Sequence, residues 1–268
     1  MTDAKKLISF DLKADFGFFK KPDYNDGMLL SYNMLHKPGL LGVLGAIIGL
    51  AGYNKKGEFP EYYQKLKSLS IGIQPLGAEK GNFQKTSVKY TNTVGYANQD
   101  GTLLIQEVML IRPSYRCFLL LDLAEENHKI LYHNVKIGYA EYIPYLGKNE
   151  FQANWLNEDG ESTFQEYEYE MFDFSKDFQI SSLFRKDDPI KGQRVELKPS
   201  FRTKNEVKRI GSFSYFEKIP VQFNTQLFQY ELFDFGYSDW LFTKESTINQ
   251  LYNIKDKQNK EQIIQLFL

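Results

Sequence analysis

The feature that most constrains the fold is an apolar run, Leu40–Ala51, which follows a His-Lys-Pro-Gly sequence. Gly42, Gly45 and Gly49 recur in this run at spacings of three and four, so they share one face of a helix. A glycine face is flat and lets another backbone approach closely. The run has 12 residues, too few to span a bilayer as a helix. We therefore expect a buried helix over Leu40–Tyr53, packed closely against another element.

The aromatic content indicates a protein rich in strands. The chain has 268 residues, and 22 Phe, 18 Tyr and 2 Trp make up 16% of it. Apolar and charged contents of 42% and 25% are ordinary globular values and argue against overall disorder. The single Cys117 excludes an internal disulfide framework and suits a reducing cytoplasm. Without a secretory hydrophobic region after Met1, we expect a cytoplasmic protein with no membrane partner.

Alternating apolar and polar residues predict most of the elements. A long polar stretch, Leu76–Gly101, separates two of the predicted strands, and connections of this length are usually functional or mobile. We expect helical structure over Glu61–Leu69, over part of Glu125–Gly138 and at both ends of Ser246–Leu268. The expected strands are Leu7–Phe19, Ser70–Gln74, Thr102–Arg112, Tyr115–Leu123, Phe164–Phe174, Gly211–Glu217 and Gln226–Phe235.

Charge is balanced overall but segregated along the chain. Lys and Arg number 33 against 34 Asp and Glu, whereas residues 155–180 carry one basic and eight acidic side chains. A protein that binds nucleic acid through bulk charge is usually basic overall, so binding here must be local, through the N-terminal third or 185–209. Glu166, Glu168 and Glu170 share one strand face, which we expect to meet solvent or a basic partner. The opposite face, predicted to pack inward, holds Tyr167, Tyr169 and Met171.

Few motifs of catalysis or metal binding occur. Three His and one Cys form no metal-ligand spacing, and no phosphate-binding loop or nucleophile elbow is present, so we expect no metal and no cofactor. Cys117 lies in an apolar strand where a thiolate would be poorly solvated. His128 and Lys129, with His133, form a candidate acid–base cluster for RNA cleavage. The alternative is that His128 and Lys129 are ordinary polar surface residues.

The start of the glycine-rich helix is a candidate phosphate site. A helix N-terminus presents amide donors and a positive dipole to anions. We expect Lys37, the amides of Gly39–Leu41 and Lys148 to form a phosphate cradle.

Five segments together resemble a known family. They are Phe10–Phe16, Tyr32–Gly49, Ile105–Arg116, Tyr142–Phe151, and Ile219–Val221 followed by the aromatic strand Tyr230–Phe235. This combination is similar to the CRISPR-associated RAMP proteins called Cas-five, and the subtype resembles type I-B.

The resemblance implies an α+β fold. Family members have a ferredoxin-like (RRM-like) βαββαβ core, a long β-hairpin thumb and additional C-terminal β-strands. On this basis residues 1–154 form the RNA-binding domain, with the thumb at 77–101, and residues 155–268 form a β-rich extension.

The resemblance also implies a function in antiviral defence. Such a protein is a non-catalytic subunit of Cascade that binds the 5′ handle of the crRNA, caps the Cas-seven backbone, contacts the Cas-eight large subunit and lies near the PAM-proximal end of the target DNA. The residues expected to contact RNA are Lys13, Tyr32, Asn33, His36, Lys37, Gly39, Leu40, Lys80, Lys85, Lys89, Arg112, Tyr115, Arg116, Gly147, Lys148 and Asn149.

Two alternatives to RNA binding without catalysis stay open. In type I-C the homologous protein cleaves precursor crRNA without a metal, using a Tyr and a Lys-His pair. Here the comparable pair is reversed, His128-Lys129, with Tyr53 as the candidate tyrosine. The other alternative is a protein-interaction module that presents its aromatic and acidic faces and binds no RNA.

Overall fold

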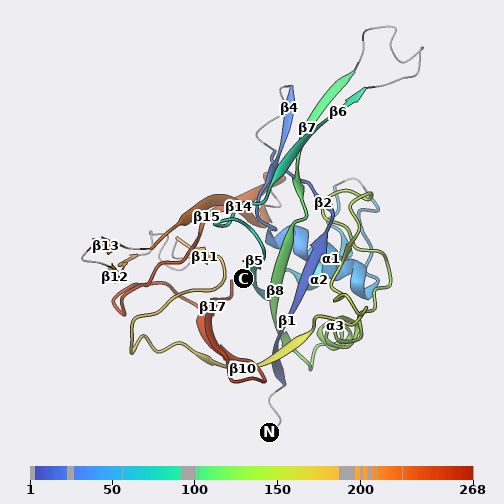
Figure 1. Cartoon of the computed structure of the whole chain (residues 1–268). Coiled ribbons are helices and arrows are strands. Elements are labelled where there is room, and N and C mark those ends of the chain that lie inside the picture. Colours follow the sequence, from blue (N-terminus) through green and yellow to red (C-terminus); the bar gives the residue numbers. More distant parts are fainter. Residues whose placement is uncertain are drawn as a thin grey trace.

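The computed structural model describes residues 4–22, 27–55, 57–91, 101, 103–186, 197–199, 202–204, 207–209, 211–224 and 226–267. Over these residues the chain is a strand-rich α+β protein with few helices, and a long hairpin projects from a rounded body (Figure 1). No helix in the described part is long and apolar enough to cross a membrane.

A large antiparallel sheet forms the centre of the body. It comprises β1 (Lys5–Ala14), β5 (Ser70–Pro75), β8 (Ser114–Asp122), β9 (Ala153–Asn154), β10 (Gln165–Met171), β16 (Leu251–Lys255) and β17 (Glu261–Gln265). The strands lie in the order β17-β16-β10-β1-β8-β5, and β9 pairs with the end of β1. Every neighbouring pair in this order is antiparallel.

Three helices lie beside this sheet: α1 (Lys37–Ile48), α2 (Glu61–Leu66) and α3 (Glu126–Ile137). α1 contacts both of the others. It begins at Lys37, earlier than the apolar run, because His36 caps it and Pro38 fits a first turn that needs no amide donor. It ends at Ile48, before Tyr53, because Gly49 takes a left-handed conformation with φ 76°.

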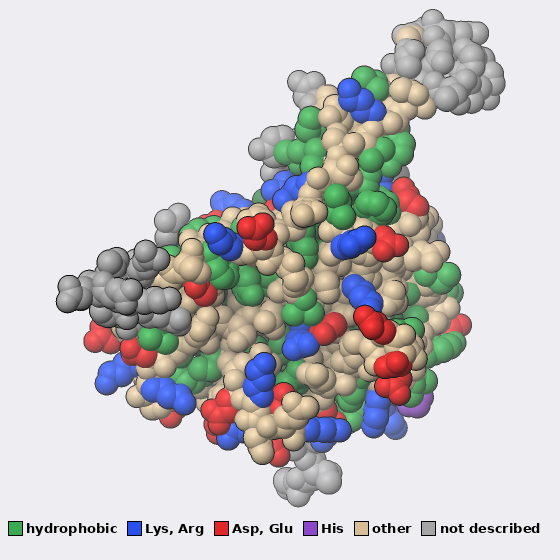
Figure 2. Space-filling model, viewed as in Figure 1, with side chains coloured by type: hydrophobic (Ala, Val, Ile, Leu, Met, Phe, Trp, Pro, Cys, Tyr) green, Lys and Arg blue, Asp and Glu red, His purple; other side chains and the backbone are tan. Residues whose placement is uncertain are grey.

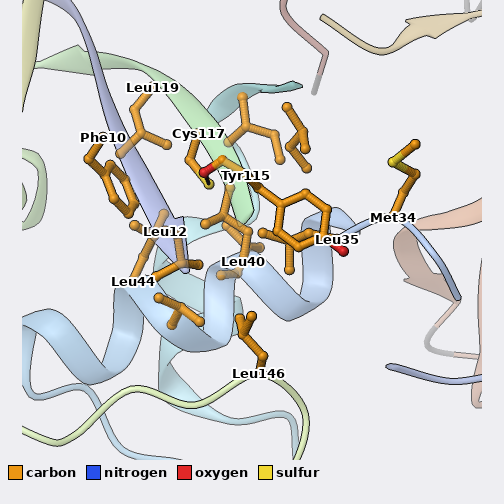
Figure 3. Packing of buried hydrophobic residues seen from close by; sticks show 14 of the residues in the cluster. Phe10, Leu12, Met34, Leu35, Leu40, Leu44, Tyr115, Cys117, Leu119 and Leu146 are labelled. Atoms are coloured by element: carbon orange, nitrogen blue, oxygen red, sulfur yellow. Dashed lines mark hydrogen bonds between the residues drawn. The ribbon is translucent and has the colours of Figure 1, made fainter. Parts of the chain in front are cut away.

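The main core lies between this sheet and α1. Phe10 and Leu12 of β1 point toward Leu40 and Leu44 of α1, and Cys117 of β8 lies in the same layer (Figure 3). All five side chains are fully buried. Burial of each large apolar side chain contributes about 1.5–3 kcal/mol. Burial also raises the pKa of the Cys117 thiol well above its ordinary value.

The opposite face of the sheet is covered because the sheet closes on itself. Ile71 of β5 and Phe267, just after β17, exchange backbone hydrogen bonds of 3.0 and 2.8 Å. β5 and β17 are the two ends of the strand order, so this contact joins its edges. Leu7, Phe118 and Ile264 pack together inside the closed sheet as a separate buried cluster.

The predicted helical ends of Ser246–Leu268 are wrong, because this segment forms β16 and β17. Read alone, its short apolar runs fit a helix or a strand. Pairing with β10 selects the strand conformation. The edge of β10 that faces away from β1 pairs with β16, with Tyr169 opposite Ile254. The backbone groups of both strands then have partners.

The predicted strand over Phe164–Phe174 is confirmed as β10, with one correction. Tyr167 is buried and Tyr169 partly buried, but Met171 is 69% exposed and does not pack inward. Pairing with β1 stops at Tyr167, so among the described strands Met171 has a paired neighbour only on the β16 edge, at Tyr252. On the acidic face Glu168 and Glu170 are exposed.

The projecting hairpin consists of β6 (Lys85–Thr91) and β7 (Leu104–Ile111), paired along their whole length. β2 (Phe16–Gly17), β3 (Phe19–Lys20) and β4 (Met28–Tyr32) flank its base. Hydrophobic and basic side chains both reach the surface along the hairpin (Figure 2). The expected thumb at 77–101 contains β6, while 92–100 lie outside the described residues.

The C-terminal region adds a smaller sheet of β11 (Phe184–Arg185), β14 (Ser214–Asn224) and β15 (Gln229–Ser238), and a pair, β12 (Arg202–Lys204) and β13 (Val207–Arg209). Ile219 and Phe235 of this sheet belong to the same core as β1. Residues 1–154 and 155–268 therefore share both a core and the central sheet.

Candidate nucleic-acid interface

A groove of about 970 Å³ lies along the glycine face of α1. Several separate parts of the chain line it: α1 and the segment 50–53 after it, Tyr62 of α2, the base of the hairpin with the strands beside it, the loop 142–148 and Tyr230 of β15. About half of its lining residues are aromatic or glycine, and Lys20, Lys148 and Glu107 are the charged members.

The two ends of the glycine face have different roles. Gly39 and Gly42 lie in the groove wall, and a Cβ built on Gly42 meets the Tyr62 ring only at ordinary contact distance, 3.8 Å. A Cβ on Gly45 would lie 2.4 Å from Cβ of Tyr62. The N-terminal part of α1 therefore faces the groove, and the part that follows packs against α2.

Tyrosines from distant positions form the walls of the groove. Tyr53 and Tyr142 are 68% and 57% exposed, and Tyr145 and Tyr230 are also accessible. Exposed aromatic rings are platforms on which unpaired bases stack, and stacking tolerates any base. A flat floor with tyrosine walls is therefore suited to the bases of a single-stranded nucleic acid.

His36 organises one end of this groove. Its Nδ1 accepts a hydrogen bond of 3.1 Å from the Gly39 amide, and its ring lies 5.6 Å from Phe19 and Tyr32 and 6.0 Å from Tyr230. Burial lowers the pKa of His36 to about 4, so the ring is neutral at pH 7. His36 therefore caps the helix and supports the aromatic wall without adding charge.

The structure does not assemble the predicted phosphate cradle. The Gly39 amide is bonded to Nδ1 of His36, and the Leu40 amide to the His36 carbonyl. Lys37 is 2% exposed and is not among the groove residues. Burial lowers the pKa of Lys37 to about 8. The amides of Gly39 and Leu40, two of the expected phosphate donors, are therefore already hydrogen-bonded to His36, and Leu40 itself is buried.

Lys148, one of the residues expected to contact RNA, lies in the groove, and its charge is paired. Its ammonium contacts the Glu107 carboxylate and lies 4.9 Å from the Tyr90 ring and 5.2 Å from the Phe18 ring. Gly147, before it, has φ 88°, and a Cβ there would collide with the Phe18 carbonyl oxygen at 1.9 Å. This loop is thereby fixed against the base of the hairpin.

Several predicted RNA-binding residues are structural. Asn33 is buried; its side-chain amide donates to the Gly81 carbonyl at 2.7 Å and accepts from the Phe83 amide at 3.1 Å. The Tyr115 hydroxyl, also buried, donates to the Asn33 carbonyl at 2.6 Å. Tyr32 is buried beside His36. These groups hold the segment before α1 in place and are not accessible to RNA.

Arg116 also has a partner within the chain. Its Nε and Nη2 donate to the two Asp11 carboxylate oxygens at 2.7 and 2.8 Å, which is a bidentate pair. The side chain is about three-quarters buried. The other expected contacts are exposed and lie outside the groove: Lys13, Lys80, Lys85, Lys89, Arg112 and Asn149.

The structure separates the members of the candidate cleavage cluster. Tyr53 lines the groove, whereas His128 and Lys129 are on the first turn of α3 and do not line it. Nδ1 of His128 accepts a hydrogen bond of 3.1 Å from the Asp122 amide, and burial lowers the pKa of His128. No group of three or more His, Cys, Asp or Glu in the described residues is placed to hold a metal ion.

Sequence reasoning missed the groove tyrosines as a set. Tyr142, Tyr145 and Tyr230 lie in segments that carry the family resemblance, but the sequence gives Tyr53 only a role in cleavage and gives Tyr62 no functional role. The available signal was the excess of tyrosine. Which tyrosines meet is decided by the packing of α1, α2 and β15.

No protein-family model matches the sequence, and no curated protein matches it. Among solved structures, a CRISPR protein from Archaeoglobus fulgidus is 13% identical, with a TM-score of 0.44, over 97% of this chain and 99% of that chain. A chain of a CRISPR RNA-guided surveillance complex is 11% identical, with a TM-score of 0.43, over 87% and 91%. A chain of a type III-B Cmr-beta complex, bound to cognate target RNA and AMPPnP, is 12% identical, with a TM-score of 0.38, over 90% and 86%.

These three similar structures are thus CRISPR proteins or chains of CRISPR complexes. Identities of 11–13% are too low to transfer the role of any residue from those chains to this one.

Proposed function

We propose that the protein is a non-catalytic, RNA-binding subunit of a CRISPR complex, and that its groove holds the single-stranded 5′ handle of a crRNA. The observation that carries this proposal is the groove itself, with its glycine floor and tyrosine walls. Such a surface matches unpaired bases, whose faces stack on aromatic rings.

The order of the elements supports the Cas-five assignment made from the sequence. β10-β1-β8-β5 are neighbours in the sheet, with α1 between β1 and β5 along the chain and α3 between β8 and β10. This order supports the proposed ferredoxin-like βαββαβ core. The hairpin of β6 and β7 is then the thumb, and β14 to β17 are the additional C-terminal strands.

The proposed partners follow from the same resemblance. The protein would cap the Cas-seven backbone, contact the Cas-eight large subunit and lie near the PAM-proximal end of target DNA, in a type I-B complex. The separation of Tyr53 from His128 and Lys129 supports a binding role over cleavage of precursor crRNA.

The groove is tested with single-stranded RNA of the repeat from the same genome, labelled with 2-aminopurine, which reports stacking. Tyr142→Ala with Tyr145→Ala should weaken binding by about 1–3 kcal/mol for each base that loses its platform. The change in fluorescence on binding should shrink at the same time. Double-stranded RNA should compete poorly, because its bases are already stacked.

Tyr139→Ala is the matched control. Tyr139 is an exposed tyrosine three residues before Tyr142, it lies outside the groove, and its hydroxyl donates to Glu141 at 2.9 Å. Unchanged RNA affinity in the Tyr142/Tyr145 variant, or an equal loss in the Tyr139 variant, would show that the groove is not the RNA site.

A further inference from the structure

An ion pair joins two walls of the groove. Glu107 is on β7 of the hairpin, where Leu29 of β4 and Val88 of β6 pair with it on either side. Lys148 reaches Glu107 from the loop 142–148, and both residues line the groove. The surface of the groove therefore carries a carboxylate and an ammonium group side by side.

The surrounding residues hold this pair in place. Glu107 is 6% exposed and has strand neighbours on both sides. The Lys148 ammonium lies 4.9, 5.2 and 6.0 Å from the rings of Tyr90, Phe18 and Phe151, distances at which cation–π attraction operates. Groups fixed in this way are preorganised for binding, because little side-chain freedom remains to be lost.

The pair does not use all of its hydrogen-bonding capacity. Lys148 contacts Oε2 of Glu107, whereas Oε1 has no hydrogen-bond partner among the described residues. Lys148 has three donors, and its next carboxylate, Glu150, lies 3.8 Å away, beyond hydrogen-bond distance. A buried acceptor without a donor costs free energy. A groove ligand that donates N–H groups to Glu107 would remove this cost.

The charge of the pair favours a base over a phosphate at this position. The carboxylate of Glu107 repels an anion and offsets the attraction of Lys148. A base that stacks on a tyrosine keeps its edge free for hydrogen bonds. The pair is therefore suited to the polar edge of a base.

The donor and the acceptors of the pair match one base best. The ammonium of Lys148 is a donor, and the two carboxylate oxygens of Glu107 are acceptors. The Watson–Crick edge of guanine has the complementary set, the acceptor O6 followed by the donors N1–H and N2–H. Adenine, cytosine and uracil each offer a carboxylate only one donor nitrogen on that edge.

We propose that Glu107 and Lys148 form a guanine-selective subsite of the groove. Glu107 accepts from N1–H and N2–H of an unpaired guanine, and Lys148 donates to its O6. This inference rests on the proposed function, because it requires a single strand in the groove. It adds selectivity for a base, which the tyrosine walls lack, since stacking tolerates any base.

The first test uses the parent protein and short polyuridine RNA strands that carry one guanosine, inosine or adenosine at the centre. Fluorescence anisotropy measures their affinities. The guanosine strand should bind about 5- to 150-fold more tightly than the adenosine strand, the range expected for one bidentate base contact. Inosine lacks the N2 amino group, so its strand should have an intermediate affinity.

The second test is Glu107→Gln, which keeps the size of the side chain but replaces one acceptor by a donor. This variant should bind the three strands with similar affinity. The measured quantity is the ratio between strands, so a general change in affinity from the unpaired Lys148 cancels. Thermal melting checks that the variant is folded, and if it is not, the inosine comparison on the parent protein still decides.

Glu150→Gln is the matched control. Glu150 is the other carboxylate near Lys148, but its side chain is 59% exposed and does not line the groove. This variant should keep the preference for guanosine. Free guanosine monophosphate should compete with the guanosine strand only at much higher concentration, because it lacks the neighbouring stacked bases. Competition at equal concentration would overturn a strand as the ligand.

Equal affinity of the parent protein for the guanosine and inosine strands would overturn the subsite. So would an undiminished preference for guanosine in a folded Glu107→Gln protein, or an equal loss of preference in the Glu150→Gln protein. The proposed function is judged separately. Strands that bind through Tyr142 and Tyr145 without selectivity would overturn this inference alone, whereas no binding of any strand would overturn both.

Discussion

At the scale of single residues, His36 shows how one side chain serves both fold and site. It caps α1 through Nδ1 and lies among Phe19, Tyr32 and Tyr230. A protonated ring could not accept the Gly39 hydrogen bond through Nδ1. The cap therefore requires the neutral form.

This requirement predicts a pH dependence of stability. The pKa of His36 is about 4 in the folded chain and about 6.5 when unfolded, so the unfolded state binds more protons between these values. The free energy of unfolding should be highest above pH 6.5 and fall as the pH drops from 6.5 to 4, by up to about 3 kcal/mol. Urea denaturation at a series of pH values measures it.

Carboxylates titrate in the same range, so the comparison is with His36→Asn. Asn is also a good helix cap and does not ionise. The difference in unfolding free energy between parent and variant should change with pH between 6.5 and 4. A constant difference would show that His36 is not held neutral by burial.

At the scale of elements, the regularly spaced glycines of α1 have two different structural roles. Its glycines look equivalent in the sequence, yet Gly42 opens onto the groove and Gly45 contacts Tyr62 of α2. The same substitution should therefore have opposite effects at the two positions.

Gly45→Ala should destabilise the protein by about 1–3 kcal/mol, because its Cβ would lie 2.4 Å from Cβ of Tyr62 and force the helices apart. Gly42→Ala should be neutral or stabilising by about 0.5–1 kcal/mol, since Ala is the better helix former and the space is open. Thermal melting of the two variants compares them directly. A Gly45→Ala protein that melts like the parent would contradict the close packing.

At the scale of the whole molecule, closure of the sheet depends on the end of the described chain. Phe267 is fully buried, bonds to Ile71 through its backbone and lies 4.9 Å from the Phe235 ring. It thereby joins β5, the C-terminal strands and the core that supports α1.

Phe267→Ala should consequently cost about 3–5 kcal/mol of global stability, as for other buried Phe truncations. Phe228→Ala, at a position that is 63% exposed, is the control and should change stability little. Denaturant unfolding followed by tyrosine fluorescence measures both. Equal effects of the two substitutions would contradict the closed sheet.

The sequence by itself determined the local elements. Alternation predicted β1 and β10, and continuous apolar runs predicted β8 and α1, because these patterns record which side chains of one segment are buried. It also placed the family resemblance on segments that surround the groove. The sequence pattern did not predict β16 and β17. A short apolar run fits a helix or a strand, and its conformation here depends on the strand edge with which it pairs.

Only the tertiary structure decided which residues are available to a ligand. The sequence alone does not distinguish Lys37, Lys80 and Lys148. In the structure Lys37 is buried, Lys80 is exposed without an ion pair to a described residue, and Lys148 is paired with Glu107. Burial and pairing arise from contacts between segments far apart in the chain, such as β7 with the loop 142–148. Such contacts produce no periodic pattern in the sequence of either segment. The groove and the cations without ion pairs therefore cannot be predicted from the sequence alone.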